Sequence, residues 1–144
     1  MNRADMDRLV NIHIEAEMAA NTAGAVSVYT EDVEHDVVGI PDGPAHGKAA
    51  AKGFYDQLVR DIRTETMEPT RRYYGDDFCV IEHQCTATVF GTFLGLPGNG
   101  RRVSFRLLHI WEFRDGRISR ENIWLDGGSI AQQLTAPKSM AVGV

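Results

Sequence analysis

Two apolar segments separated by a single turn signal constrain the fold of this chain more than any other feature. Residues 101–113 and 116–126 are rich in β-branched, aromatic and aliphatic side chains, and Asp115-Gly116 lies between them. An Asp-Gly pair in this setting favours a two-residue type I′ turn, because that turn needs positive φ at both central positions. The sequence therefore predicts an antiparallel hairpin.

Counting outward from that turn gives a register in which Arg114 pairs with Arg117 and His109 lies opposite Asn122. One face of the hairpin then holds Phe105, Leu107, His109, Trp111, Asn122, Trp124 and Asp126. The opposite face is also apolar in its middle, so both faces need cover. We expect helices to cover one face and a second copy of the chain to cover the other, in a homodimer. A bulge in either strand would shift this parity.

Helical patterns precede the strands along the chain. Apolar residues recur with helical spacing over residues 5–20 and 48–63, and residues 25–29 form a short additional helix. The remaining segments are expected to be strands over residues 30–40, 67–75 and 77–94, in addition to the hairpin. Helices followed by a run of antiparallel strands predict an α+β domain. We expect one domain over residues 1–144, with a frayed tail from about residue 135.

Composition excludes several classes of protein. A chain of 144 residues with 43% hydrophobic content suits one domain. The formal charge of -5 and the scattered basic residues argue against nucleic acid as a partner. No apolar run approaches the about 20 residues of a membrane span, so we expect no membrane partner and a cytoplasmic protein. The cysteines and histidines lack the short fixed spacings of a metal site, and we expect no metal.

Asp126 is the candidate with the clearest chemical rationale. It follows the apolar run Ile123-Trp124-Leu125, where burial would disfavour the charged carboxylate and raise its pKa toward neutrality. Such a carboxylate can exchange protons with a substrate. The alternative is that Asp126 caps the turn that follows it. His109 is either a catalytic base or hydrogen-bond donor, or a buried histidine bonded to Asn122.

Several motifs together resemble those of a known fold family. Two helical segments, the stretch "EHDVV", a Gly-Lys helix start and the closing pattern "WEFRDGRI" followed by "WLD" are similar to the NTF2-like superfamily, and most of all to its SnoaL-like branch. The resemblance implies a cystatin-like cone in which a strongly curved antiparallel sheet wraps around the N-terminal helices and encloses one apolar pocket. It also implies a homodimer through the outer sheet face.

The resemblance assigns roles to individual positions. Asp126 matches the acid/base aspartate of SnoaL-like cyclases, and Asp36 is similar in position to the general base of ketosteroid isomerases. His13 falls where those isomerases bind an oxyanion with tyrosine, and His109 falls near their protonated aspartate. His35 and Asp36 point to opposite faces of their strand, so only one of them can face the pocket. Catalytic candidates are therefore Asp126, His109 and Asp36, and substrate-binding candidates are His13, Asn122, Trp124, Trp111, Phe105, Tyr55 and Phe54.

These residues favour a proton-transfer enzyme that needs no cofactor and acts on an apolar, carbonyl-bearing molecule by aldol-type cyclisation, isomerisation or dehydration. One alternative resembles the limonene-epoxide hydrolases, which activate water; it needs a second acid such as Asp36, with Arg106 as a bridging cation. Another alternative is a binding or interaction module without catalysis. Its mark would be a pocket carboxylate with an ordinary pKa, or one neutralised by an arginine such as Arg106 or Arg120.

Overall fold

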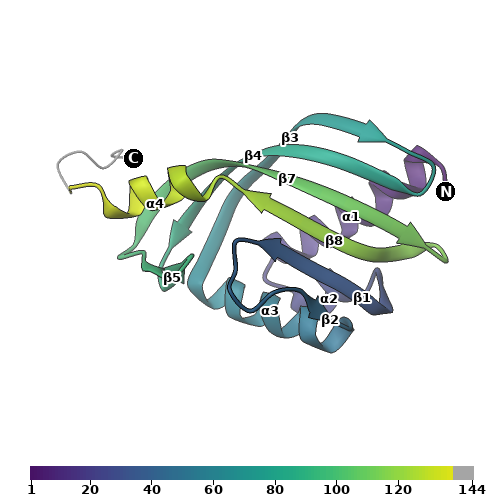
Figure 1. The fold of residues 1–144 in the computed structure, drawn as a ribbon, viewed down its shortest axis with the longest axis horizontal. Coiled ribbons are helices and arrows are strands. Elements are labelled where there is room, and N and C mark those ends of the chain that lie inside the picture. The colour runs from purple at the N-terminus through teal and green to yellow at the C-terminus, as the bar shows by residue number, and fades with distance from the viewer. Residues whose placement is uncertain (138–144) are drawn as a thin grey trace.

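Helices from the N-terminal third lie against one face of a six-stranded sheet in the computed structural model, which describes residues 1–137 (Figure 1). The helices are α1 (Arg3–Met18), α2 (Thr22–Val26), α3 (Lys48–Asp61) and α4 (Gly127–Thr135). The strands are β1 (Tyr29–Val38), β2 (Ala45–His46), β3 (Ile62–Tyr74), β4 (Phe78–Val89), β5 (Thr92–Phe93), β6 (Leu96–Pro97), β7 (Arg101–Arg114) and β8 (Arg117–Leu125). The architecture confirms the α+β class. The tail from residue 138 onward lies outside the described residues.

The sheet runs in the order β2-β1-β8-β7-β4-β3. Strand β1 pairs in parallel with β8, and the other neighbours pair antiparallel. Strands β5 and β6 form a separate small hairpin. This order places the first and the last long strands side by side, so residues from both ends of the chain meet on one face.

Helix α1 forms where the apolar spacing predicts it. The side chain of Asn2 caps the helix by accepting a hydrogen bond from the Asp5 backbone N-H at 2.8 Å. Met6, Val10 and His13 recur at helical spacing and are buried against the sheet. His13 is polar, but it lies on the same helix face as these apolar residues and is therefore buried with them.

Several boundaries differ from the sequence expectation. The short helix expected over residues 25–29 lies at Thr22–Val26, and Tyr29 already belongs to β1. The strand expected over residues 77–94 ends at Val89. Helix α3 ends at Asp61 because Ile62 takes extended φ and ψ of -135° and 133°, so β3 begins five residues before the expected start at residue 67. Helix α4 was not anticipated. It begins where the Asp126 side chain accepts a hydrogen bond from the Ser129 backbone N-H at 3.1 Å.

The hairpin turn is confirmed. Asp115 and Gly116 have φ of 54° and 73°, and Arg114 pairs with Arg117. Positive φ at both central residues is the conformation that the Asp-Gly pair supplies at low cost.

The register beyond this turn differs from the simple count. Glu112 pairs with Arg120, not with Ser119, so Ser119 is an extra residue in β8. Such a bulge shifts the alternation of side chains by one position. His109 therefore lies opposite Ile123, and the predicted pairing of His109 with Asn122 is wrong.

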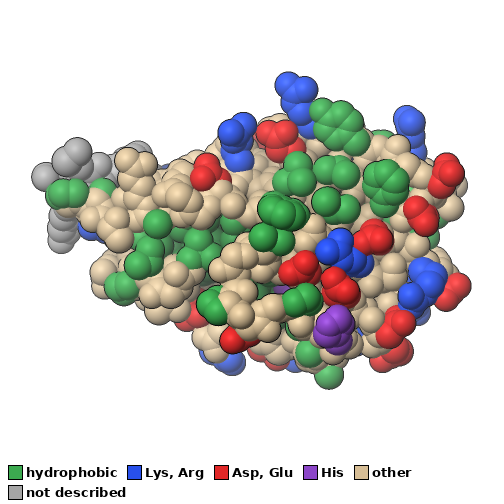
Figure 2. Space-filling model, in the orientation of Figure 1, with side chains coloured by type: hydrophobic (Ala, Val, Ile, Leu, Met, Phe, Trp, Pro, Cys, Tyr) green, Lys and Arg blue, Asp and Glu red, His purple; other side chains and the backbone are tan. Residues whose placement is uncertain are grey.

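The bulge exchanges the two faces of β8. Glu121 and Ile123 face the helices, and Asn122 and Trp124 face outward. On the outer face Trp124 lies between Val38 and Leu108. Hydrophobic side chains gather over this part of the sheet in the space-filling view (Figure 2). Within residues 1–137, no helix is both long and apolar enough to cross a membrane.

Substitution of the bulge residue and of the residue before it tests the packing assigned to this part of β8. Ile118 is fully buried, so Ile118→Ala should lower the free energy of unfolding by about 2–5 kcal/mol through the cavity it leaves. Ser119→Ala should change it by less than about 0.5 kcal/mol, because the bulge residue contributes no core packing. Urea unfolding of both variants measures the difference. Equal losses would contradict the burial assigned to Ile118 and the partial exposure assigned to Ser119.

Candidate active site

A pocket of about 400 Å³ opens between the inner face of the sheet, helix α3 and the β5–β6 hairpin. Its walls are mainly apolar, and they include Val37, Phe54, Leu58, Phe105, Leu107 and Ile123. Exposed residues such as Gly39, Pro41 and Gly95 form the rim. Tyr55, His109 and Glu121 are buried and form the closed end. The pocket therefore combines an apolar body with a polar floor, as small-molecule sites commonly do.

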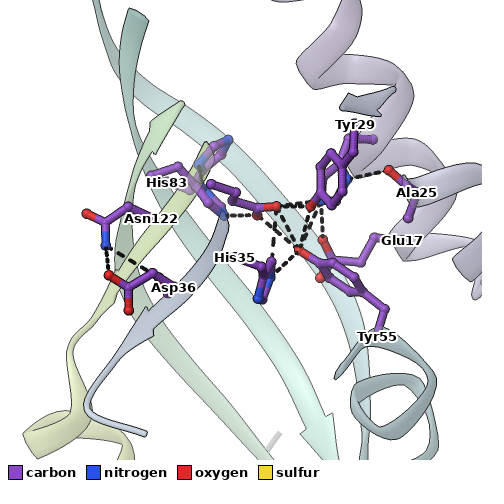
Figure 3. Close-up of polar contacts among 11 residues, drawn as sticks. Glu17, Ala25, Tyr29, His35, Asp36, Tyr55, His83 and Asn122 are labelled. Atoms are coloured by element: carbon purple, nitrogen blue, oxygen red, sulfur yellow. Dashed lines mark hydrogen bonds and ion pairs between the residues drawn. The ribbon is translucent and has the colours of Figure 1, made fainter. Parts of the chain in front are cut away.

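Glu121 is the centre of the polar floor. Its side chain is fully buried, and Tyr55 donates to both carboxylate oxygens at 3.0 Å. Tyr29 donates a further hydrogen bond to Oε2. A buried carboxylate is tolerated only when donors replace its lost hydration, and these hydroxyls supply that replacement. Figure 3 shows the converging contacts around Tyr55.

His13 supplies the positive charge of the cluster. Its Nδ1 donates to the Ala25 carbonyl at 2.7 Å, and its Nε2 lies 3.5 Å from Glu121 and 3.6 Å from Glu17. Burial by itself disfavours the imidazolium, but the two carboxylates outweigh it and raise the pKa of His13 to about 9. His13 is therefore protonated at neutral pH.

The neighbours of Glu121 keep it ionised. Burial by itself would raise the pKa of this carboxyl, but His13 and the hydrogen bond from His109 lower it well below the usual value. The pKa of Tyr55 is raised far above its usual value by burial and by the charge of Glu121. Burial lowers the pKa of His35, whose Nε2 lies 3.1 Å from the Tyr55 hydroxyl. Glu121 and His13 thus form an ion pair, with the neutral groups of Tyr55 and His35 beside it.

His109 links Glu121 to the pocket wall. The side chain is 3% exposed and lines the pocket, and its Nε2 lies 3.3 Å from a Glu121 oxygen. Because the ionised carboxylate only accepts, this nitrogen carries a hydrogen. The other nitrogen, Nδ1, lies 3.4 Å from His83 Nδ1, and burial lowers the pKa of His83 to about 3. Trp111 stacks on the His109 ring at 4.8 Å between centroids and fixes its plane.

Asp126 lies away from this floor. It is exposed, caps α4, and does not line the pocket. The expectation that an apolar environment raises its pKa rested on a face that the Ser119 bulge changes. The arrangement matches the alternative in which Asp126 caps the following turn.

Asp36, Asn122 and Trp124 gather on the outer face of the sheet. Asn122 donates to the Asp36 carboxylate at 3.1 Å, and Arg120 lies 3.3 Å from the same oxygen. Figure 3 shows Asp36 and Asn122 set apart from the cluster around Tyr55. Their expected place in the pocket is corrected, because the strand alternation and the bulge turn these side chains outward. As that alternation requires, His35 is the residue of its pair that faces the core.

The other candidates lie in or behind the pocket. Phe105, Tyr55 and Phe54 join His109 in its lining. His13 and Trp111 are fully buried behind the floor, where they contact each other edge to face. Arg106 and Arg120 pair with outer-face acids and not with Glu121.

The sequence reading did not find Glu121, Glu17, Tyr29 or His35 as site residues. Glu17 follows His13 by four positions, which places both on one helix face, and this spacing was a usable signal. Glu121 carried no such signal, because its orientation depends on the bulge. Among residues 1–137, no group of three histidine, cysteine, aspartate or glutamate side chains is arranged to hold a metal ion.

Solved structures define the class to which this fold belongs. A candidate polyketide cyclase from Xanthomonas campestris superposes with a TM-score of 0.79 over 94% of this chain and 100% of its own, at 21% identity. A candidate isomerase from Rhodopseudomonas palustris gives 0.76 over 92% and 96%, at 18% identity. An LEH-like epoxide hydrolase from M. tuberculosis gives 0.72 over 91% and 90%, at 15% identity. These structures establish an NTF2-like α+β fold.

The family follows from the sequence itself. The model of the SnoaL-like domain matches residues 10–121, and the chain belongs to this family. Structural relatives carry the names of polyketide cyclases, isomerases and epoxide hydrolases. Among curated proteins, none matches the sequence significantly.

The charge state of His13 predicts how stability depends on pH. Its pKa is about 9 in the folded protein and about 6.5 when unfolded, so its contribution is complete below pH 6.5 and is lost as pH rises through 9. The free energy of unfolding should fall across this window by up to about 1.4 kcal/mol per pH unit. Urea unfolding at several pH values measures this slope.

Two variants make the assignment specific. His13→Gln should remove the fall above pH 6.5, whereas His46→Gln, at an exposed histidine, should retain it. A wild-type stability that is flat from pH 6.5 to 9 would contradict a protonated His13.

Proposed function

We propose that this protein is a cofactor-independent acid-base enzyme that acts on an apolar, carbonyl-bearing small molecule in the pocket. The reaction class is aldol-type cyclisation, isomerisation or dehydration. One observation carries the proposal: the His109 and Glu121 side chains form a buried pair in the floor of an otherwise apolar pocket.

The pair suits proton transfer. Glu121 fixes the ring of His109 through Nε2. Nδ1, which lies 3.4 Å from His83 Nδ1, is the nitrogen that can take up a proton once a ligand displaces that contact. When His109 gains charge, the adjacent carboxylate stabilises it, as an acidic partner does for other catalytic histidines. Glu121 is a poor base itself because four neighbours hold it ionised. We assign the proton to His109 and the positioning role to Glu121.

Exclusion of water from the pocket floor would further stabilise the transition state of a carbonyl substrate. A positioned acid or base contributes about 10²–10⁴-fold to a rate, and exclusion of water strengthens each electrostatic contact with a developing enolate. The buried side chains of Phe105 and Leu107 line the wall on the same strand as His109 and exclude water there.

Water activation is the second candidate. The Glu17 and Glu121 carboxylates both lie within 3.6 Å of His13 Nε2, an acid-cation-acid arrangement suited to polarising a water molecule. Asp36, the second acid expected from the sequence, is on the outer face, and Glu17 takes its place in this candidate. Formation of diols from terpene epoxides, without proton exchange on ketones, would favour it.

Exchange of carbon-bound hydrogen tests the first candidate without knowledge of the natural substrate. A proton-transfer enzyme should catalyse deuterium incorporation next to the carbonyl of polycyclic or steroid ketones in D₂O, measured by mass spectrometry. His109→Gln should lower the exchange rate by about 100-fold or more, because the transferring group is removed.

Asp126→Asn and His46→Gln are the matched controls and should retain exchange. Loss of exchange in Asp126→Asn with retention in His109→Gln would return the catalytic role to Asp126. Binding of ketones without exchange in the wild type would favour a non-catalytic module.

We further propose a homodimer through the outer sheet face. Val38, Val80, Leu108 and Ile110 are only half-buried there, and Trp124 is 50% exposed. They form a continuous apolar area beside the ion pairs of Arg120. Exposed apolar areas of this kind mark association surfaces.

Sedimentation velocity at micromolar concentration tests the dimer. The wild type should sediment as a dimer and Trp124→Glu as a monomer, because the introduced charge would be buried at the interface. Phe90→Glu changes an equally exposed aromatic in the loop after β4 and should remain dimeric. A monomeric wild type would contradict the proposal.

A further inference from the structure

Glu17 is a buried acid of the pocket that the proposed proton transfer does not use. Its side chain is 9% exposed and lines the pocket. Within residues 1–137 the contact of its carboxylate with charge is His13 Nε2, at 3.6 Å from Oε2. That nitrogen is shared with Glu121 and Tyr55, which lie closer. The second oxygen of Glu17 thus has no polar partner in the part of the chain that the structure describes.

The distribution of charge around the pocket is one-sided. Glu17, Asp61 and Glu121 line it, and within residues 1–137 no lysine or arginine does. At the floor, the carboxylates of Glu17 and Glu121 both lie within 3.6 Å of His13 Nε2 and share its imidazolium. Two carboxylates that share one imidazolium are costly to desolvate, and an entering cation would give the second one a partner.

The apolar lining also suits a cation that carries an apolar body. The rings of Phe54 and Tyr55 meet edge to face at 5.4 Å, and both line the pocket with Phe93 and Phe105. Aromatic rings attract ammonium groups, and do so more strongly in desolvated sites. An anionic ligand would meet the carboxylates without a compensating partner.

We propose that the natural ligand carries a basic nitrogen on an apolar body and that Glu17 binds this nitrogen as an ammonium ion. The inference rests on the proposed function, because it specifies the substrate class of the same pocket. Glu17 acts here as a binding residue and takes no part in the proton transfer assigned to His109.

Three probes with one ring system and different charge test the inference: 2-naphthylmethylamine, 2-naphthylmethanol and 2-naphthoate. Isothermal titration at pH 7 should give a dissociation constant for the amine at least tenfold lower than that for the alcohol. The carboxylate should bind more weakly than the alcohol.

Glu17→Gln should remove the advantage of the amine and leave the affinity for the alcohol within about twofold, because the amide retains the shape but not the charge. Glu15→Gln, at an exposed position of the same helix, should leave all three affinities unchanged.

The outcomes separate the two proposals. An alcohol that binds as tightly as the amine to the wild type overturns the ligand class and leaves the pocket intact. An amine advantage that persists in Glu17→Gln also overturns it. If none of the three probes binds, the ligand class and the small-molecule pocket fail together. The order of the three affinities in the wild type tests the proposed ligand class even if Glu17→Gln does not fold.

Discussion

The buried carboxylate of Glu121 is the constraint on which the rest of this structure depends. A lone carboxylate in a protein core is too costly to keep, so the fold must bring donors to it from several elements. Helix α1 supplies His13, β1 supplies Tyr29, α3 supplies Tyr55 and β7 supplies His109. The positions of these elements are therefore coupled through one group. This coupling also preorganises the floor of the pocket, because any of these side chains that turned away would remove one partner from the buried charge.

Much of the fold could be predicted from the sequence, because patterns among neighbouring residues determine its helices and turns. The stripe of Met6, Val10 and His13 and the Asp115-Gly116 turn each depend on neighbouring residues, and both took the expected form. The orientation of β8 could not be predicted in the same way. Ser119 is an unremarkable residue, and nothing in its neighbourhood marks it as a bulge. One extra residue exchanged the faces of Asn122 and Glu121, and with them the candidate acid.

The same limit explains the split among candidate residues. Four predicted residues line the pocket as expected: Tyr55 and Phe54 on α3, and Phe105 and His109 on β7. No bulge interrupts either element, so the side chains keep the direction that the sequence pattern predicts. The apolar residues before Asp126 led to its prediction as a catalytic acid. A helix that follows a strand also needs an N-cap residue, and Asp126 is the N-cap of α4. Resemblance to a family gave the correct fold. It did not show which side chains of β8 face the pocket, because that depends on the backbone bulge at Ser119.

The parallel pairing of β1 with β8 has a consequence for how the protein is made. Asp36 and Asn122 lie side by side although 86 positions separate them, and contacts of such separation close late in folding. During synthesis β8 leaves the ribosome after nearly all other elements. Until it inserts between β1 and β7, His13 and Tyr55 lack the Glu121 carboxylate that they contact in the folded protein. The polar cluster of the nascent chain is therefore incomplete until its last strand is made. That strand completes the sheet and also supplies the carboxylate around which the site is arranged.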